Sequence, residues 1–210
     1  RFGPSPTGFM HIGGLYTSLV SRRLAHQSGG KFFLRIEDTD KKREVEGTVD
    51  LILASLATYG LSPDEGEIAD GQEIGAYGPY RQSERSDIYR QHADQLLDSG
   101  HAFRCFCTSE RLDQLRKTQM EEKQPIGYDG HCQHLEQAEI DQRLANNESH
   151  VVRMNVPREG QCVFNDMLRG EISIDWTQID LQVLLKADGM PTYHLANVVD
   201  DYAMNISHVI

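Results

Sequence analysis

The sequence contains no long apolar segment and no leader of the secretory type. No run approaches the roughly 20 apolar residues that a membrane-spanning helix needs. The first residues, RFGPSPTG, lack the basic start and apolar core of a signal peptide, and they include no initiator methionine. We therefore expect a cytoplasmic protein, and a sequence that starts inside its first strand.

Positive charge is scarce as well. The 210 residues include 21 Lys and Arg against 32 Asp and Glu, which gives a formal net charge of −11. This balance argues against binding nucleic acid through an overall field, because phosphate groups attract basic faces. The local clusters Arg22-Arg23 and Lys41-Lys42-Arg43 are more typical of a solvated surface. A nucleic-acid partner would have to be held by individually placed residues.

The first hundred residues alternate between strand and helix patterns. Hydrophobic residues make up 39% of the chain and charged residues 25%, enough for one large domain or two modest ones. Apolar spacing predicts helices at 12–28, 44–59 and 83–99, and apolar runs predict strands at 1–3 and 31–37. This order predicts a Rossmann-like, doubly wound parallel sheet of the α/β class.

The middle of the chain has a different pattern. Short alternating stretches at 150–156, 162–164 and 171–174 and a polar helical segment near 109–122 predict an α+β insertion. The α/β pattern resumes near Gly189 and ends in a predicted strand, ISHVI. The expected division is a first half of the α/β domain at 1–104, an insertion at 105–187, and the start of the second half of the α/β domain at 188–210.

The segment RFGPSPTGFMHIGG predicts a ligand-binding turn between a strand and a helix. Pro4 and Pro6 stiffen the turn, and Gly8 allows a ligand to approach the backbone closely. His11 is expected near the helix N-terminus, where unpaired N–H groups and the helix dipole favour phosphate. His-Ile-Gly-Gly alone would fit any tight turn that precedes a helix, so its interpretation depends on the rest of the chain.

Five segments in order identify a family. They are P-S-P-T-G with H-I-G-G, L-R-I-E-D-T-D at 34–40, Y-G-P-Y-R-Q-S-E-R at 77–85, F-N-D-M-L-R-G-E-I at 164–172, and P-T-Y-H-L-A-N-V-V-D-D at 191–201. Together they resemble the class I aminoacyl-tRNA synthetases of the glutamate/glutamine subclass. At the first two segments glutaminyl enzymes typically have P-E-P-N-G and D-D-T-N, where this chain has P-S-P-T-G and E-D-T-D. The chain therefore resembles the glutamyl enzymes more. The fourth position of the His-Ile-Gly-His motif is Gly14, which leaves His11 as its only imidazole.

The resemblance implies the N-terminal catalytic part of a glutamate–tRNA ligase, whose substrates are ATP with Mg²⁺, L-glutamate and tRNA(Glu). It further implies a connective insertion that binds the acceptor stem, a monomer, and no membrane partner. Two rivals remain open: the paralogue that glutamylates queuosine on tRNA(Asp), and a non-catalytic, zinc-containing tRNA-binding fragment. The family's second nucleotide-binding loop, of Lys-Leu-Ser-Lys-Arg type, and its anticodon-binding region do not occur in these 210 residues.

The resemblance also assigns site residues. A substrate carboxylate suits a guanidinium, which binds it bidentately and keeps its charge. The implied catalytic contacts are His11, Gly13 and Gly14, the implied ATP contacts are Thr7, Gly8, His11 and Gly13, and the implied glutamate contacts are Arg1, Ser5, Glu37, Tyr193 and Asn197. Two alternatives stay open: Arg1 and Glu37 could form a surface ion pair, and Tyr193 could be a core aromatic residue.

Three of the four cysteines predict a structural zinc site. Cys105-Phe106-Cys107 is followed by Cys132-Gln133-His134, and two ligand pairs separated by a loop are typical of zinc in a protein without disulfides. The one-residue spacing is tighter than usual. Many glutamyl synthetases resemble this pattern, which implies Cys105, Cys107, Cys132 and His134 as ligands. Tyr128 is the alternative fourth ligand, as in the queuosine paralogue, and Cys162 is expected to be a small buried residue.

Overall fold

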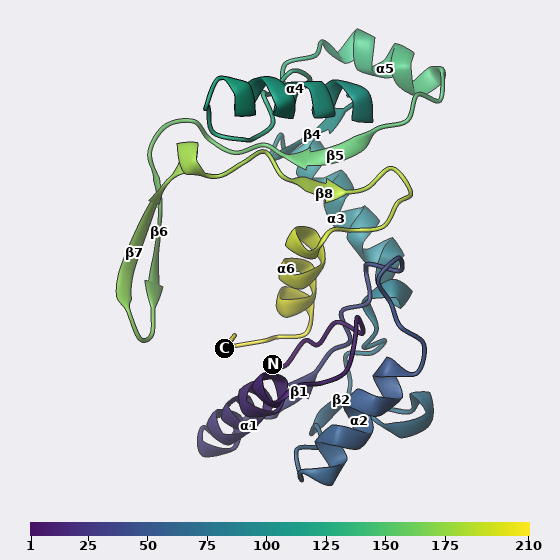
Figure 1. The fold of residues 1–210 in the computed structure, drawn as a ribbon, viewed down its shortest axis with the longest axis vertical. Coiled ribbons are helices and arrows are strands. Elements are labelled where there is room, and N and C mark those ends of the chain that lie inside the picture. Colours follow the sequence, from purple (N-terminus) through teal and green to yellow (C-terminus); the bar gives the residue numbers. More distant parts are fainter. The chain divides into compact units, whose positions relative to one another are not determined.

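The computed structural model describes the backbone of residues 1–210 and every side chain except that of Asp70. The chain divides into two compact units (Figure 1). Unit 1 comprises Arg1–Tyr89 and Leu195–Ile210, and unit 2 comprises Arg90–His194. Two helices, α3 (Ser86–Asp98) and α6 (Tyr193–Ala203), each have residues in both units. The division at 104/105 and 187/188 expected from the sequence stays a prediction. No helix among the described residues has the length and apolarity to cross a membrane.

Unit 1 contains a mixed sheet. Strand β1 (Phe33–Leu34) pairs in parallel with β2 (Glu65–Glu67), which pairs antiparallel with β3 (Glu73–Ile74). Isolated parallel bridges join Phe2 to Leu34 and Ile36 to Arg81. The predicted parallel pairing is therefore confirmed near the chain start, and β3 makes the sheet mixed. The other elements are α1 (Ile12–Gln27), α2 (Thr48–Thr58), the 3₁₀ turns Ala69–Gly71 and Gln82–Arg85, α3 (Ser86–Asp98) and α6 (Tyr193–Ala203).

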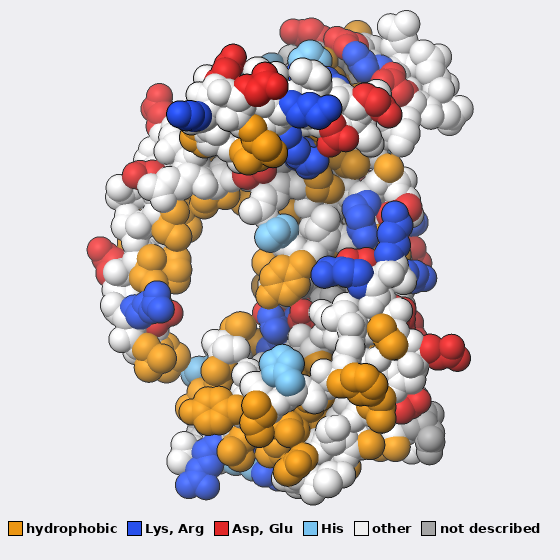
Figure 2. Space-filling model, in the orientation of Figure 1, with side chains coloured by type: hydrophobic (Ala, Val, Ile, Leu, Met, Phe, Trp, Pro, Cys, Tyr) orange, Lys and Arg blue, Asp and Glu red, His pale blue; other side chains and the backbone are white. Residues whose placement is uncertain are grey.

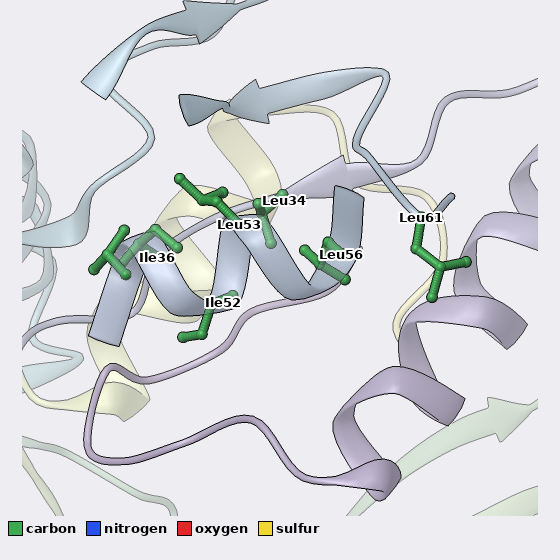
Figure 3. Close-up of a cluster of buried hydrophobic side chains, with 7 residues drawn as sticks. Leu34, Ile36, Ile52, Leu53, Leu56 and Leu61 are labelled. Atoms are coloured by element: carbon green, nitrogen blue, oxygen red, sulfur yellow. The ribbon is translucent and has the colours of Figure 1, made fainter. Parts of the chain in front are cut away.

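Helix α2 supplies four of the seven residues in one apolar cluster of unit 1. Its buried side chains pack on β1 and the residues that follow it, as Figure 3 shows. The cluster consists of Leu34, Ile36, Val49, Ile52, Leu53, Leu56 and Leu61. The helix begins at Thr48 because Gly47 has a left-handed φ of 77°, which ends the helical path on its N-terminal side. Val45, predicted as part of the helical face, precedes the helix and is half exposed.

The buried face of α1 differs from the predicted one. The helix itself is confirmed within one residue at its C-terminus, but its buried residues are Ser18 and Ser21. Leu19, predicted to face the core, is 50% exposed. The Ser18 hydroxyl donates to the Gly14 carbonyl at 2.8 Å, so this side chain is satisfied without leaving the helix. Small side chains let the helix backbone lie close to the rest of the unit.

Unit 2 contains an antiparallel sheet and a separate hairpin. The sheet has the order β4–β5–β8, from Ala102–Cys105, Val151–Met154 and Val183–Leu185. The hairpin joins β6 (Gln161–Asp166) to β7 (Gly170–Asp175), and a 3₁₀ turn follows at Trp176–Gln178. The predicted strands near 150–156, 162–164 and 171–174 are confirmed. Figure 2 shows hydrophobic side chains along the hairpin. Four large hydrophobic residues of the hairpin are exposed: Val163, Phe164, Met167 and Leu168.

Two helices complete unit 2. Helix α4 (Ser109–Glu121) confirms the polar helical segment, and the Thr108 hydroxyl caps it by accepting from the Arg111 amide. Helix α5 (Gln137–Ala145) was not predicted, because it is short and contains no fully buried residue that would mark an apolar face. The apolar cluster of this unit lies around Phe103, Tyr128, Val156 and Leu181.

The strand predicted at 206–210 is wrong. These residues adopt no regular structure, and their peptide groups pair with no described strand. The alternation of Ile206 and Ile210 around His208 fits a strand pattern, but a strand also requires a hydrogen-bonded neighbour. Here the terminal nitrogen of Arg1 donates to the His208 carbonyl at 3.2 Å.

Candidate active site and metal centre

The turn before α1 forms one wall of a small cavity. Backbone hydrogen bonds fix it at two points, since the Pro4 carbonyl accepts from the Glu37 amide and the Pro6 carbonyl accepts from the Val45 amide. The cavity has a volume of about 250 Å³, and its lining includes the predicted residues Ser5, Thr7, Gly8, His11 and Gly14. The sequence-predicted nucleotide residues are thus brought together in unit 1.

His11 is the N-cap of α1. Its Nδ1 accepts a hydrogen bond from the Gly13 amide at 3.2 Å, and the side chain is exposed. In the neutral ring an accepting Nδ1 leaves the proton on Nε2, which is an assignment from the hydrogen bond. The Nε2–H can therefore donate to an anion at the start of the helix. Gly13 contributes through its backbone, and a Cβ there would touch the imidazole at 3.0 Å.

A buried ionic cluster lies at the other end of the same motif. Arg1 binds Asp201 with two hydrogen bonds, of 2.9 and 3.3 Å, and its Nη1 lies 3.3 Å from Oε1 of Glu37. The Arg35 guanidinium donates to Glu37 at 3.0 Å and to Asp201 at 2.7 Å. Arg1 and Glu37 thus form an ion pair as the alternative proposed, but it is buried, with side chains 8% and 5% exposed.

Burial controls the charge of Glu37. Loss of water raises the pKa of this carboxyl, and the Arg1 and Arg35 guanidinium groups act in the opposite direction. The site has little spare room, because a Cβ on Gly3 would overlap both the Glu37 carboxylate and the Arg1 guanidinium. Glycine at position 3 therefore lets the strand backbone pass beside this pair.

Asp200 connects α6 to the motif at 77–85. It is fully buried and accepts hydrogen bonds from Gln82 at 3.0 Å, Arg85 at 2.7 Å and Tyr89 at 2.7 Å. Burial, followed by the neighbouring Asp200 charge, raises the pKa of Tyr89, so this hydroxyl remains a donor. The Asp38 carboxylate similarly accepts from the amide and hydroxyl of Ser83. Residues of the 77–85 motif therefore hold the carboxylates of Asp38 and Asp200, which belong to two other motifs.

Sequence reasoning assigned no role to Arg35, Asp38, Asp200 or Asp201. All four belong to segments that identified the family, L-R-I-E-D-T-D and V-V-D-D, so the signal was present. Their roles depend on partners distant in the sequence: Ser83 lies 45 residues from Asp38, and Asp201 lies 166 residues from Arg35. No local pattern predicts such a pairing.

The two predicted glutamate contacts on α6 lie one turn apart. Tyr193 belongs to unit 2 and Asn197 to unit 1. Tyr193 is 51% exposed, which contradicts the alternative of a core aromatic residue. The Asn197 Oδ1 is buried and has no hydrogen-bond partner among the described residues. An unsatisfied buried acceptor is costly, and a ligand donor would satisfy it.

Three of the four cysteines converge in unit 2. The Sγ atoms of Cys105, Cys107 and Cys132 all lie within 4.8 Å of one another. The Tyr128 hydroxyl lies 3.3 Å from the first sulfur and 3.4 Å from the second, and it accepts from the Cys132 amide at 2.9 Å. His134 is exposed and does not join the cluster. Three thiols beside a phenolic oxygen form a donor set that fits Zn²⁺.

Hydrogen bonding between two of the cysteines shifts their pKa values in opposite directions. A hydrogen bond with Cys132 lowers the pKa of Cys105 to about 4 against the effect of burial, and the pKa of Cys132 is raised in return. The Arg153 guanidinium stacks on the Tyr128 ring at 4.0 Å from its centroid, which holds the phenol in place. Cys162 lies on β6, is partly exposed, and takes no part in the cluster.

Known proteins of one family are similar to this chain over its whole length. Residues 1–210 match the family of class I tRNA synthetases for E and Q, catalytic domain. The chain is 54% identical to a glutamate–tRNA ligase of Psychrobacter cryohalolentis and 53% identical to one of Ectopseudomonas mendocina. In both cases all of this chain is covered, with 40% and 42% of the relative. The chain thus spans about two fifths of the length of these relatives.

A solved structure is similar throughout. A glutamate tRNA ligase from Elizabethkingia meningosepticum, in complex with its amino acid, has a TM-score of 0.92 and 39% identity, and the match covers 100% of this chain and 42% of that one. A glutamate-tRNA synthetase from Elizabethkingia anophelis gives 0.91 at the same identity, covering 100% of this chain and 43% of that one.

Proposed function

Since the chain belongs to the family of class I tRNA synthetase catalytic domains for glutamate and glutamine, we propose that it is the N-terminal catalytic part of a glutamate–tRNA ligase. The observation that carries the proposal is the turn at residues 3–11, which lies in the chain between the buried ion pair of Arg1 with Glu37 and the start of α1 that His11 caps. One side of this turn suits phosphate, and the other side suits an amino acid with a charged side chain.

The proposed reaction has two steps. An oxygen of the α-carboxylate of glutamate attacks the α-phosphorus of ATP, and pyrophosphate leaves. A terminal ribose hydroxyl of tRNA then attacks the carbonyl carbon of the mixed anhydride, and AMP leaves. Positioning and stabilisation of phosphoryl charge account for most of the rate in such transfers. Thr7, Gly8, His11 and the start of α1 at Gly13 and Gly14 would hold the nucleotide, with Mg²⁺ bound through ATP.

Glutamate would be recognised at both ends. Arg1 would bind the side-chain carboxylate, and Glu37 would bind the α-ammonium. The unsatisfied Oδ1 of Asn197 supports a further contact. Ser5 lines the nucleotide cavity, and Tyr193 has an exposed ring; both are proposed as additional contacts. The Tyr193 side chain is half exposed, and its hydroxyl can donate to or accept from a ligand.

The finer architecture is proposed on the same basis. Residues 105–187 would form a connective insertion within a doubly wound fold, and this insertion would contact the acceptor stem in a cytoplasmic monomer. Its cysteine cluster would hold one structural zinc ion. The geometry supports Cys105, Cys107, Cys132 and Tyr128 as ligands, with His134 as the less favoured fourth ligand.

The tyrosine in the cluster favours one competing function. The paralogue that acts on tRNA(Asp) resembles this chain in having a tyrosine at the fourth position. A charging assay separates the two proposals. The full-length gene product, incubated with ATP and labelled glutamate, should charge tRNA(Glu) transcripts and leave queuosine-containing tRNA(Asp) uncharged. If the protein charged tRNA(Asp) and not tRNA(Glu), our proposal would be wrong and the function would be that of the paralogue. If it charged neither tRNA, the interpretation as a non-catalytic tRNA-binding fragment would be favoured.

The role of His11 gives a separate prediction. In His11→Asn the shorter side chain still caps α1 through Oδ1, but it no longer presents a donor at the position of Nε2. We expect kcat for pyrophosphate exchange to fall about 10²–10³-fold, as for loss of one oxyanion donor, with little change in the melting temperature.

His11→Ala removes both functions and is the matched comparison. It should show the same kinetic loss and an additional destabilisation of about 1 kcal/mol from the missing cap. If His11→Asn retained full activity, the imidazole would be a cap only.

A further inference from the structure

A second cavity lies in unit 2, away from the cysteine cluster. It has a volume of about 500 Å³, within the range of small-ligand sites. Its floor includes one row across the sheet, in which Arg104 on β4 lies opposite Val152 on β5, and Val152 lies opposite Leu185 on β8. One wall is α3, and the loops 144–150 and 186–189 close the other sides. We refer to this cavity as the sheet cleft.

The sheet cleft is basic in an acidic protein. Three permanent cations line it, Arg90, Arg104 and Lys186, against two acidic side chains, Asp94 and Glu148. Glu148 already accepts a hydrogen bond from Arg143 at 2.9 Å, which reduces its effect on the cleft. A local excess of positive charge in a chain of net charge −11 indicates a position that an anion would stabilise.

Arg104 is the residue that most needs a partner. It is only partly exposed, and its guanidinium has no hydrogen bond or ion pair with any described residue. Partial burial removes water from a guanidinium, and the cost is recovered only when an anion or acceptor replaces that water. The planar fork of arginine matches two oxygens of a phosphate or carboxylate.

The polar head of a ligand would therefore lie over Arg104. The rest of the floor is apolar, with Val152 and Leu185 beside it and Leu97 on the wall. His150 adds a ring to the lining of the cleft, and this ring lies 5.2 Å from the Phe106 ring, centroid to centroid, at a tilt of 43°. A phosphate carried on a ribose fits this combination of one cation on the floor, two further cations in the lining and an apolar floor.

We propose that the sheet cleft is a phosphate-binding site, with Arg104 as its central contact and Lys186 as a contact at the rim. The phosphate has two possible sources, the backbone of an RNA partner or a free phosphate or nucleotide. The first source rests on the proposed function, because it requires that the protein bind tRNA. The second does not.

The test uses the full-length protein and two probes. For RNA, the Kd for tRNA(Glu) is measured over a series of salt concentrations. Loss of one phosphate contact in Arg104→Gln should weaken binding and lower the slope of log K against log salt by about 0.7–0.9. For the free source, inorganic phosphate and AMP are titrated by calorimetry. The KM values for ATP and glutamate should stay unchanged in the variant.

Arg116→Gln is the matched control, because Arg116 lies in the same unit, is exposed, and pairs with Asp113 on the surface. It should bind both probes as the wild type does. Lys186→Gln provides an independent second variant if Arg104→Gln folds poorly, which its melting temperature will show. Weaker binding of tRNA by the variants supports the site and identifies RNA as the source of the phosphate. Weaker binding of inorganic phosphate or AMP supports the site and identifies a free phosphate or nucleotide as the source. If Arg104→Gln and Lys186→Gln change neither, the proposal is wrong. A wild type that charges no tRNA refutes the proposed function, and the phosphate titration still tests the sheet cleft.

Discussion

Replacing Arg1 with glutamine in the full-length enzyme should raise the KM for glutamate by about two to four powers of ten and leave the KM for ATP nearly unchanged. The side-chain carboxylate of the substrate would be buried without its charged partner, at a cost of roughly 3–5 kcal/mol. In our proposal ATP is held at the other side of the turn, at His11, so its binding should not depend on Arg1. Pyrophosphate exchange at varied glutamate and varied ATP measures both constants.

The pH profile gives a second readout of the same variant. Burial raises the pKa of Glu37, and Arg1 is the first of the groups that lower it. Without Arg1 that pKa should rise further. In the proposed role Glu37 would bind the substrate ammonium only when ionised, so glutamate binding should be lost as the pH falls through this pKa. In Arg1→Gln the loss should therefore begin at a higher pH than in the wild type.

Arg23→Gln is the control for Arg1→Gln, because Arg23 is exposed on α1. It should leave both KM values unchanged. Arg35 still pairs with Glu37 and Asp201 in Arg1→Gln, so we expect the unit to fold. An unchanged KM for glutamate in a folded Arg1→Gln enzyme would show that Arg1 only holds Asp201 in place.

Replacing Cys132 with serine should abolish zinc binding and melt unit 2 at a lower temperature than unit 1. The wild type purified without chelator should contain about one zinc ion per chain. Four protein ligands leave no open position, so the ion would be structural. Residues 108–131 are mostly polar, and α4 has no buried residue, so metal binding would supply part of the folding free energy of this region.

Two further variants identify the fourth ligand. Tyr128→Phe removes the hydroxyl that contacts two of the sulfur atoms and should weaken zinc binding. His134→Ala changes an exposed side chain and should have little effect. Zinc retained in Tyr128→Phe but lost in His134→Ala would make histidine the ligand. A metal-free wild type with an ordered unit 2 would contradict the whole proposal.

Much of the fold followed from local signals. The helix at 12–27 begins at a histidine cap and ends near two glycines, and the helix at 109–121 begins at a threonine cap, so both could be predicted within one residue. The errors arose where packing overrides pattern. Ser18 is buried while Leu19 is exposed, because hydrophobic spacing does not show how closely a helix backbone approaches its neighbours. The strand predicted at 206–210 failed for lack of a partner.

In the candidate site too, residues close together in the sequence could be predicted, and contacts between residues far apart in the sequence could not. Thr7, Gly8 and His11 lie within five residues of one another, and the sequence alone places them around one turn. The partners of Arg1 could be assigned only in part, because Asp201 is 200 residues away. For the zinc site, spacing predicted the three cysteines. It could not choose between Tyr128 and His134, since that choice depends on which side chain is buried.

The small buried face of α1 has a consequence for protein engineering. Ser18 lies two helical turns after His11, and a helix is stiff over that length. A larger side chain at Ser18 has no space to occupy, so it would displace the helix instead of bending it. The displacement would reach the imidazole at the other end. A substitution that touches no ligand could thus slow turnover, and libraries aimed at thermostability should leave this serine fixed while freely varying the exposed Leu19.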